Sequence, residues 1–296
     1  MLWLLLLGLG TLVILALIVQ LSGQDPRGAL DALWRGAFGT SHGLAATASR
    51  AVILTFYALG ILISFRAGTL NIGAEGQSRA GAALAAAIGT GAAGATIGSV
   101  PVLGVAFVLV AGAAVGALWS LIAGWLRQWR AVPEVISTLM LNFIAFELVR
   151  YFLSTLRLLQ GPGSEHKSDY MAEALRLSGW ETRFHPILLL GVIATLAAHV
   201  FLVHTPAGFA LRAVGSNAKA AQTCGMAVDR IQLASFAIAG ALAGFAGALG
   251  VLGLWHLSNT PTYPDYGFMA IAVALVADLK PLRVLPVAVI FAGLDV

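Results

Sequence analysis

Long apolar runs separated by short polar segments make up most of this chain. The longest uncharged run, Ala80–Leu126, has 47 residues. A helix needs about 20 apolar residues to cross the hydrocarbon, so this run predicts two spans joined by a turn in the glycine-rich stretch Gly89–Pro101. Further spans are predicted at Met1–Gln24, Leu44–Phe65, Pro133–Ser154, Phe184–Thr205 and Ile231–Leu254. A short apolar piece follows Tyr266, and a last run is cut off at Val296.

These runs predict about eight or nine apolar spans in an all-α, polytopic integral membrane bundle. Composition agrees, because 59% of residues are hydrophobic and 10% charged, with a mean hydropathy of +0.90. Soluble domains carry about 25% charged residues. A soluble enzyme, a disordered protein and a secreted disulfide scaffold are therefore excluded, and the lone Cys224 leaves no intrachain disulfide. We expect one transmembrane domain over residues 1–296.

Charge along the chain predicts its orientation. With the N-terminus in the cytoplasm, the loops at 66–79, 127–134, 206–230 and 278–283 are cytoplasmic and hold nine Lys or Arg against four Asp or Glu. Cytoplasmic loops of membrane proteins carry such an excess. The pI of 9.6 is therefore a loop bias rather than a nucleic-acid signature, and the partner it indicates is the lipid bilayer, with no nucleic acid.

The sequence does not indicate catalysis. It contains no G-x-x-x-x-G-K-[ST] phosphate loop and no G-x-S-x-G nucleophile turn. Its six histidines show no close metal-ligand spacing. We expect no catalytic residue, no metal site and no cofactor in this chain, so a separate polypeptide would supply any energy that it needs.

Glycines at helix-packing spacing predict close helix contacts. Gly112 and Gly116 are four residues apart, as are Gly240 and Gly244. Small residues at this spacing let two helix backbones approach closely in lipid. We therefore expect these glycines to serve packing rather than ligand binding.

The segment Phe65–Gln77 lies between two apolar spans yet has neither helical nor loop character. It contains three glycines and the polar residues Asn71, Glu75 and Gln77. Non-helical backbone at membrane depth survives only where protein buries it or water fills a cavity. A glycine-interrupted segment also points to the substrate region of a transporter. An ordinary cytoplasmic turn with helix caps is the open alternative, in which Glu75 pairs with Arg66 or Arg79.

Four blocks of sequence resemble one protein family. The string Phe65-Arg-Ala-Gly68 followed by Asn71-Ile-Gly-Ala-Glu-Gly-Gln77 is similar to the signature of the larger permease subunit of nucleoside ATP-binding cassette (ABC) importers. These belong to the permease family that also serves ribose and branched-chain amino acids. The blocks Pro133–Asn142, Leu211–Met226 and Tyr266–Leu275 resemble that family in the same order.

The resemblance implies a permease subunit of a bacterial inner-membrane importer that takes up nucleosides or related sugar-like solutes. A separate ATPase subunit, which binds ATP and Mg, would drive it. The other implied partners are a second, paralogous permease and a substrate-binding lipoprotein or periplasmic protein. Two half-repeats are implied, each with a broken helix, at residues 68–77 and 265–275. The substrate-pathway residues that follow are Phe65, Asn71, Glu75, Gln77, Asn142, Tyr266 and Phe268.

The polar segment 206–230 is predicted to lie inside and to couple the chain to its ATPase. Its apolar residues recur three or four apart, which suits a short helix laid across a groove on a partner; a solvated loop helix is the alternative. The resemblance implies docking on the ATPase subunit. The coupling residues are Leu211, Arg212, Gly215, Asn217, Ala221 and Gly225.

Two rival functions can be weighed against the importer, and only the first stays open on the sequence. An ion-coupled secondary transporter of a small polar solute would also place Asn71 and Glu75 at a midplane site, with Glu75 carrying a proton. A membrane-embedded enzyme would need a catalytic pair facing one cavity, and the sequence offers none. Members of the resembling family continue with further helix after the position of Val296, so we expect a C-terminally truncated chain.

Overall fold

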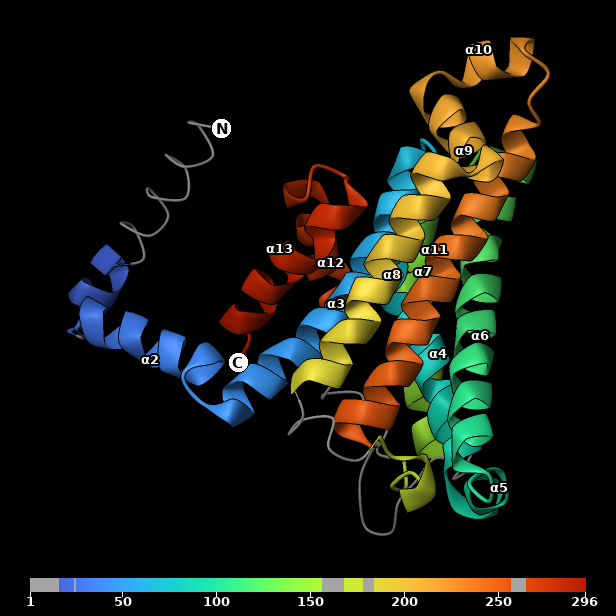
Figure 1. Cartoon of the computed structure of the whole chain (residues 1–296). Coiled ribbons are helices and arrows are strands. Elements are labelled where there is room, and N and C mark those ends of the chain that lie inside the picture. Colours follow the sequence, from blue (N-terminus) through green and yellow to red (C-terminus); the bar gives the residue numbers. More distant parts are fainter. Residues whose placement is uncertain (1–15, 24, 156–167, 178–183, 257–264) are drawn as a thin grey trace.

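Helices make up nearly all of the computed structural model, which describes residues 16–23, 25–155, 168–177, 184–256 and 265–296 (Figure 1). No strand occurs in these ranges. The all-α fold predicted from the apolar runs is therefore confirmed.

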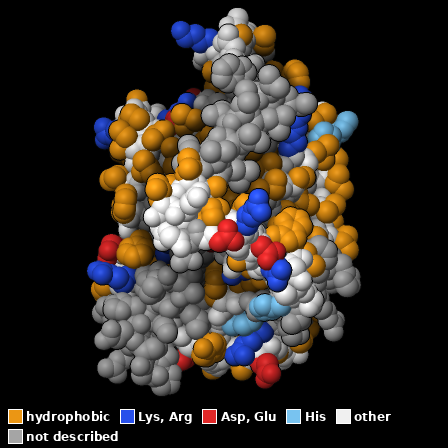
Figure 2. Space-filling model, turned by 90° about the vertical axis from the view of Figure 1, so that its left-hand side faces the viewer, with side chains coloured by type: hydrophobic (Ala, Val, Ile, Leu, Met, Phe, Trp, Pro, Cys, Tyr) orange, Lys and Arg blue, Asp and Glu red, His pale blue; other side chains and the backbone are white. Residues whose placement is uncertain are grey.

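Six long helices form the body of the molecule and run along a common direction in Figure 1. They are α3 (Ser41–Arg66), α4 (Ala74–Gly89), α6 (Pro101–Arg130), α7 (Glu134–Thr155), α8 (Phe184–His204) and α11 (Val228–Gly250). Helix α3 is central, since 89% of its most apolar stretch is buried against 22% in α6. The outer helices therefore present apolar side chains outward, as the wide orange areas of Figure 2 show on one face.

Helices α6 and α11 cross at the glycines that the sequence singles out. A Cβ atom on Gly116 would overlap the carbonyl oxygen of Gly240, and one on Gly244 would overlap that of Gly112. Only hydrogen fits between backbones at this distance, so all four glycines serve close packing as predicted.

Within the described residues, four helices are individually long and apolar enough to cross a membrane: α3, α6, α7 over Glu134–Leu153, and α11 with the π-helix η2 over Val228–Trp255. Two bent pairs raise the number to six: α4 with α5 (Gly91–Ile97), bent by 81°, and α8 with α9 (Pro206–Ser216), bent by 73°. The predicted first span, Met1–Gln24, lies mainly outside the described residues. The predicted turn at Gly89–Pro101 contains α5.

The remaining apolar helices are shorter than a span: α12 (Tyr266–Val276) and α13 (Pro281–Leu294). The prediction of a broken helix at residues 265–275 is wrong in position, because α12 is continuous over this apolar stretch. The interruption follows it, where Asp278 and Leu279 adopt left-handed φ angles of 58° and 48° before Pro281 starts α13.

Small elements define the two ends of the bundle. At one end lie α9 and α10 (Ala218–Thr223), and at the other lie α5 and the short 3-10 helix η1 (Glu173–Leu175) (Figure 1). Helix α2 (Pro26–Phe38) leaves the bundle sideways, before α3. The end with α9 and α10, called the α9–α10 end below, carries the segment predicted to couple.

Candidate functional site

The chain is unwound between α3 and α4, from Ala67 to Gly73, as the glycine pattern predicts. Three side chains of α7, spaced four residues apart, bind its backbone. Glu134 Oε1 accepts a hydrogen bond from the Leu70 N–H at 2.9 Å, and Thr138 Oγ1 accepts one from the Ile72 N–H at 3.3 Å. Unwound backbone needs such partners because buried N–H and C=O groups are costly to leave unsatisfied.

Asn142 completes this polar stripe on α7. Its Oδ1 accepts from the Gly76 N–H at 2.8 Å, and its Nδ2 donates to the Ile72 carbonyl at 3.0 Å. The predicted pathway residue Asn142 is thus engaged on both sides of its amide by the backbone of the broken segment, and it fixes the position of α7 against the first turn of α4.

Asn71 and Gln77 form a second, more deeply buried contact. Asn71 Oδ1 accepts from the Gly73 N–H at 2.9 Å and from Gln77 Nε2 at 3.0 Å, and its Nδ2 lies 3.3 Å from Ser120 Oγ on α6. Their side chains are 1% and 2% exposed. The structure therefore brings these two predicted residues together in a network of neutral amides and hydroxyls.

Glu75 belongs to the same region but has different partners. Its Oε1 pairs with Arg79 Nε at 2.9 Å, and its Oε2 accepts from the Gly267 N–H at 2.8 Å. Arg79 also lies 3.6 Å from Asp265. Of the two pairings left open by the sequence, the structure has the one with Arg79, whereas Arg66 Nε donates to the Leu279 carbonyl. Glu75 thereby joins α4 to α12.

The three aromatic residues predicted for the pathway lie apart from one another. Phe65 is half-buried against the core, and Tyr266 is buried with its hydroxyl donating to Asp295 at 2.7 Å. Phe268 is 44% exposed on α12. The Phe268 side chain is therefore available for contact at the exposed surface of α12. Tyr266 holds the start of α12 against the end of α13.

The predicted coupling residues give segment 206–230 its shape. Leu211 and Ala221 are buried, Arg212 is half-buried, and Asn217 Oδ1 caps α10 by accepting from the Ala220 N–H at 3.0 Å. Gly225 takes a left-handed φ of 79° after α10. The segment is thus a pair of short helices rather than a loose loop.

Gly215 brings this pair of helices onto the broken segment. A Cβ atom on Gly68, where φ is 73°, would lie 3.1 Å from the Gly215 Cα. One on Gly215 would overlap the carbonyl oxygen of Arg66. The C-terminal turn of α9 and the first residues after α3 therefore touch backbone to backbone, and movement of either displaces the other.

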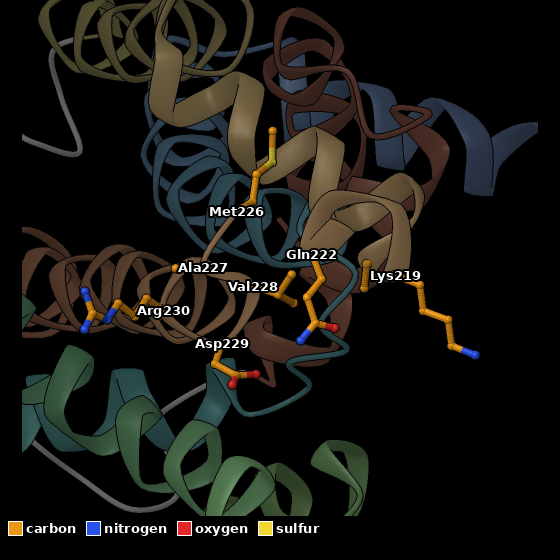
Figure 3. Close-up of a pocket in the computed structure, with 8 residues that line it drawn as sticks. Lys219, Gln222, Met226, Ala227, Val228, Asp229 and Arg230 are labelled. Atoms are coloured by element: carbon orange, nitrogen blue, oxygen red, sulfur yellow. The ribbon is translucent and has the colours of Figure 1, made fainter. Parts of the chain in front are cut away.

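A solvent-exposed pocket of about 330 Å³ lies between α10 and the start of α11. In Figure 3 the side chains of Lys219 and Arg230 point away from each other on opposite sides of it, with Gln222 and Asp229 between them. Gln128 Nε2 on α6 donates to the Asp229 carbonyl at 2.6 Å and so ties α6 to this wall. The pocket offers polar and charged groups to a partner.

Comparison with known proteins decides the family. Residues 43–296 match the family described as branched-chain amino acid transport system / permease component. The chain belongs to this family. No solved structure matches it.

Three relatives of known assignment illustrate the range of this permease family. The guanosine ABC transporter permease protein NupP of Bacillus subtilis is 31% identical over 95% of this chain and 80% of its own length. The glucose ABC transporter permease protein TsgB13 of Haloferax volcanii is 30% identical over 92% and 73%. The nucleoside ABC transporter permease protein NupB of Lactococcus lactis is 27% identical over 95% and 79%.

Family membership establishes the chain as a multi-pass transport subunit, the permease of an ABC importer. Within this permease, sequence reasoning missed Glu134, Thr138 and Ser120 as partners of the broken segment. The spacing of Glu134, Thr138 and Asn142 by four residues on one helix face is the signal that could have found two of them. Among the described residues, no group of three or more His, Cys, Asp or Glu could hold a metal ion.

Proposed function

We propose that this permease imports nucleosides, driven by a separate ATPase subunit that binds ATP and Mg. The observation that carries the proposal is the backbone contact of Gly215 with Gly68, which joins the exposed helices α9 and α10 to the broken segment. Two of the three relatives reported above are named for guanosine or nucleosides, which supports the substrate class.

The ATPase would dock on α9 and α10, where the pocket of Figure 3 exposes Lys219, Gln222 and Asp229. Closure of the ATPase upon ATP would displace α9. Because Gly215 contacts Gly68 directly, that displacement would draw the unwound segment away from α7 and alternate the access of the pathway.

The pathway itself would run along α4. The neutral groups of Asn71, Gln77 and Asn142 suit ribose hydroxyls and base edges, and they would become available to substrate as the segment moves from α7. Phe268 would meet the pathway where a second, paralogous permease covers α12. An apolar pocket of about 320 Å³ between α4, α6 and α7 offers space beside the proposed pathway.

Orientation and remaining partners complete the proposal. We infer from the excess of basic residues at the α9–α10 end that this end, and the N-terminus, face the cytoplasm at a bacterial inner membrane. A substrate-binding lipoprotein or periplasmic protein would deliver the nucleoside to the opposite end.

The decisive experiment reconstitutes the permease pair with its ATPase in liposomes and measures uptake of radiolabelled guanosine. We expect uptake with ATP, none with a hydrolysis-deficient ATPase, and competition by unlabelled nucleosides but not by glucose. Uptake driven by a proton or sodium gradient without ATP would instead favour the secondary transporter. ATP-driven uptake of glucose alone would refute the substrate class while leaving the coupling intact.

A further inference from the structure

A second pocket at the α9–α10 end, of about 260 Å³, lies apart from the pocket of Figure 3 and shares Arg212 with the coupling segment. It lies between the ends of α3 and α8, the start of α13 and one side of α9. Four cationic side chains line it: Arg66, Arg212, Lys280 and Arg283. They come from three distant parts of the sequence, so the fold gathers a positive charge that no single run of residues contains.

One carboxylate opposes these cations. Asp278 lies 2.7 Å from Lys280 Nζ and 3.4 Å from Arg283 Nη1, and the hydrogen bond from Lys280 lowers the pKa of this carboxyl below its ordinary value. Asp278 is therefore ionised at neutral pH and offsets one of the four positive charges. No other carboxylate pairs with the four cations within the described ranges.

The two arginines of the pocket that are more buried than Lys280 and Arg283 donate hydrogen bonds to uncharged groups. Arg66 Nε donates to the Leu279 carbonyl at 3.0 Å, and Arg212 Nε donates to the Gly208 carbonyl at 3.4 Å. Both side chains are half-buried and neither forms an ion pair within the described ranges, so the fold positions them while Asp278 offsets only part of the charge. The pocket thus has a net positive charge with fixed donors.

The start of α13 adds to this field. Lys280 stands at the N-cap and Pro281 at the first helical position, and the amino end of this 14-residue helix opens at the pocket. The N-terminus of a helix carries a partial positive charge and favours a bound anion. An anionic group with several oxygens fits donors arranged in this way.

Apolar side chains border the same pocket on its outward side. Val203 is 43% exposed and Leu282 is 48% exposed, and further along the same helices Val200 and Ile290 are exposed as well. A ligand bound here would contact the four cationic side chains with one end and the apolar surface of α8 and α13 with the other. A soluble anion would contact only the cationic side chains.

We propose that this pocket binds the headgroup of an anionic phospholipid of the inner leaflet, with its acyl chains along α8 and α13. Basic pockets between transmembrane helices on the cytoplasmic side suit such headgroups. The proposal rests on the orientation given under the proposed function. It is independent of which solute the permease carries.

The test uses the assembled complex of permeases and ATPase in nanodiscs of phosphatidylcholine with or without phosphatidylglycerol, followed by native mass spectrometry of retained lipid. We expect wild-type complex to retain phosphatidylglycerol, and the double variant Lys280→Gln/Arg283→Gln to retain it roughly tenfold less, since each cation near the headgroup contributes to its affinity. The matched control, Arg35→Gln/Arg150→Gln, removes two exposed cations elsewhere and should retain lipid like wild type.

Equal retention by wild type and Lys280→Gln/Arg283→Gln would overturn the proposal, as would loss of retention in the control. A second arm adds inorganic phosphate to phosphatidylcholine nanodiscs and follows thermal stability. Stabilisation by phosphate equal to that by phosphatidylglycerol would assign the pocket to a free anion instead. If Lys280→Gln/Arg283→Gln loses the ATPase but keeps phosphatidylglycerol, the cations serve the ATPase and the lipid proposal is wrong. No substrate is present, so a wrong assignment of the nucleoside leaves these outcomes unchanged.

Discussion

The carboxylate of Glu75 accepts a hydrogen bond from the backbone N–H of Gly267 at 2.8 Å, across 192 residues of sequence. The same carboxylate pairs with Arg79 at 2.9 Å. Glu75 and Arg79 are both buried, so one ion pair at the start of α4 also holds the start of α12. A glycine is required at position 267, because a Cβ atom there would lie 2.5 Å from the Glu75 backbone nitrogen.

This contact predicts a structural role for Glu75. In Glu75→Gln the side chain can still accept from Gly267, but Arg79 loses its nearest carboxylate while staying buried. Removing one partner of a buried ion pair costs about 3–5 kcal/mol when no other partner remains, and the cost here is smaller because Asp265 stays 3.6 Å from Arg79. We expect the melting temperature of the purified complex to fall by several degrees, measured by fluorescence-detected size-exclusion chromatography.

The matched control for Glu75→Gln is Glu147→Gln. Glu147 pairs with Arg150 at 2.9 Å, but both side chains are more than half exposed, so the change should leave the melting temperature nearly unaltered. A melting temperature of Glu75→Gln equal to that of wild type would show that the buried pair does not stabilise the fold. Proton-coupled uptake lost in Glu75→Gln at full stability would revive the secondary transporter.

The sequence predicts the helices well and the contacts of the broken segment poorly, for a physical reason. The span predicted over Leu44–Phe65 falls within α3, because an apolar stretch of this length, interrupted only by Arg50, is satisfied in a membrane as a helix. Glycines and amides likewise reveal that 68–77 is unusual. The partner of Leu70 is Glu134, however, and no local pattern encodes which distant side chain receives an N–H.

The position of the second interruption shows the same limit. Nothing in the apolar stretch from Tyr266 to Val276 breaks a helix, yet the resemblance implies a break there. The chain instead turns at Asp278 and Leu279; aspartate tolerates a left-handed conformation, but leucine rarely adopts one. Packing of α12 and α13 against α3 imposes that turn, and tertiary packing is not readable from residue type.

Asn71 is predicted to serve both the fold and transport. In Asn71→Ala, the Gly73 N–H and Gln77 lose their acceptor in a buried position, which costs about 1–3 kcal/mol. We expect a lower melting temperature and loss of ATP-driven guanosine uptake. Ser120→Ala is the control, since it removes only the 3.3 Å contact with Asn71 and should retain most uptake. Wild-type uptake by correctly assembled Asn71→Ala would refute a pathway through this segment.

In the coupling segment 206–230, binding of the ATPase and transmission of its movement to the broken segment can be tested by separate substitutions. Gly215→Trp would force a side chain against the Arg66 carbonyl and shift α9 from the broken segment. We expect the permease to remain in the membrane and to bind the ATPase, but substrate no longer to stimulate ATP hydrolysis. Measurements of ATPase activity and guanosine uptake on the same reconstituted complex test this. Wild-type ATPase activity together with wild-type guanosine uptake would refute the assignment of α9 as the coupling helix.

Docking is tested on the exposed wall of the pocket instead. Gln222→Trp changes a side chain that points into the pocket of Figure 3 and packs no core. The melting temperature of the permease should stay unchanged, while co-purification of the ATPase should fall by roughly tenfold, since a mismatched bulky group excludes a complementary partner. Thr96→Trp, at an exposed position of α5 at the opposite end, is the control and should retain the ATPase. Equal recovery of ATPase from both variants would contradict docking at α10.

Orientation can be tested with the native protein, because Cys224 is its single cysteine and is exposed just after α10. If the α9–α10 end faces the cytoplasm, a membrane-impermeant maleimide should leave Cys224 unmodified in intact spheroplasts and modify it in inside-out vesicles washed free of the ATPase. Asp169→Cys in a Cys224→Ser background places an exposed thiol near η1, and this variant should show the reverse pattern. Modification of Cys224 in intact spheroplasts would show that the topology is the reverse of the one proposed. The basic pocket around Arg66 would then face outward, and both the ATPase contact at Gln222 and the inner-leaflet lipid would be ruled out together, whichever solute the permease carries.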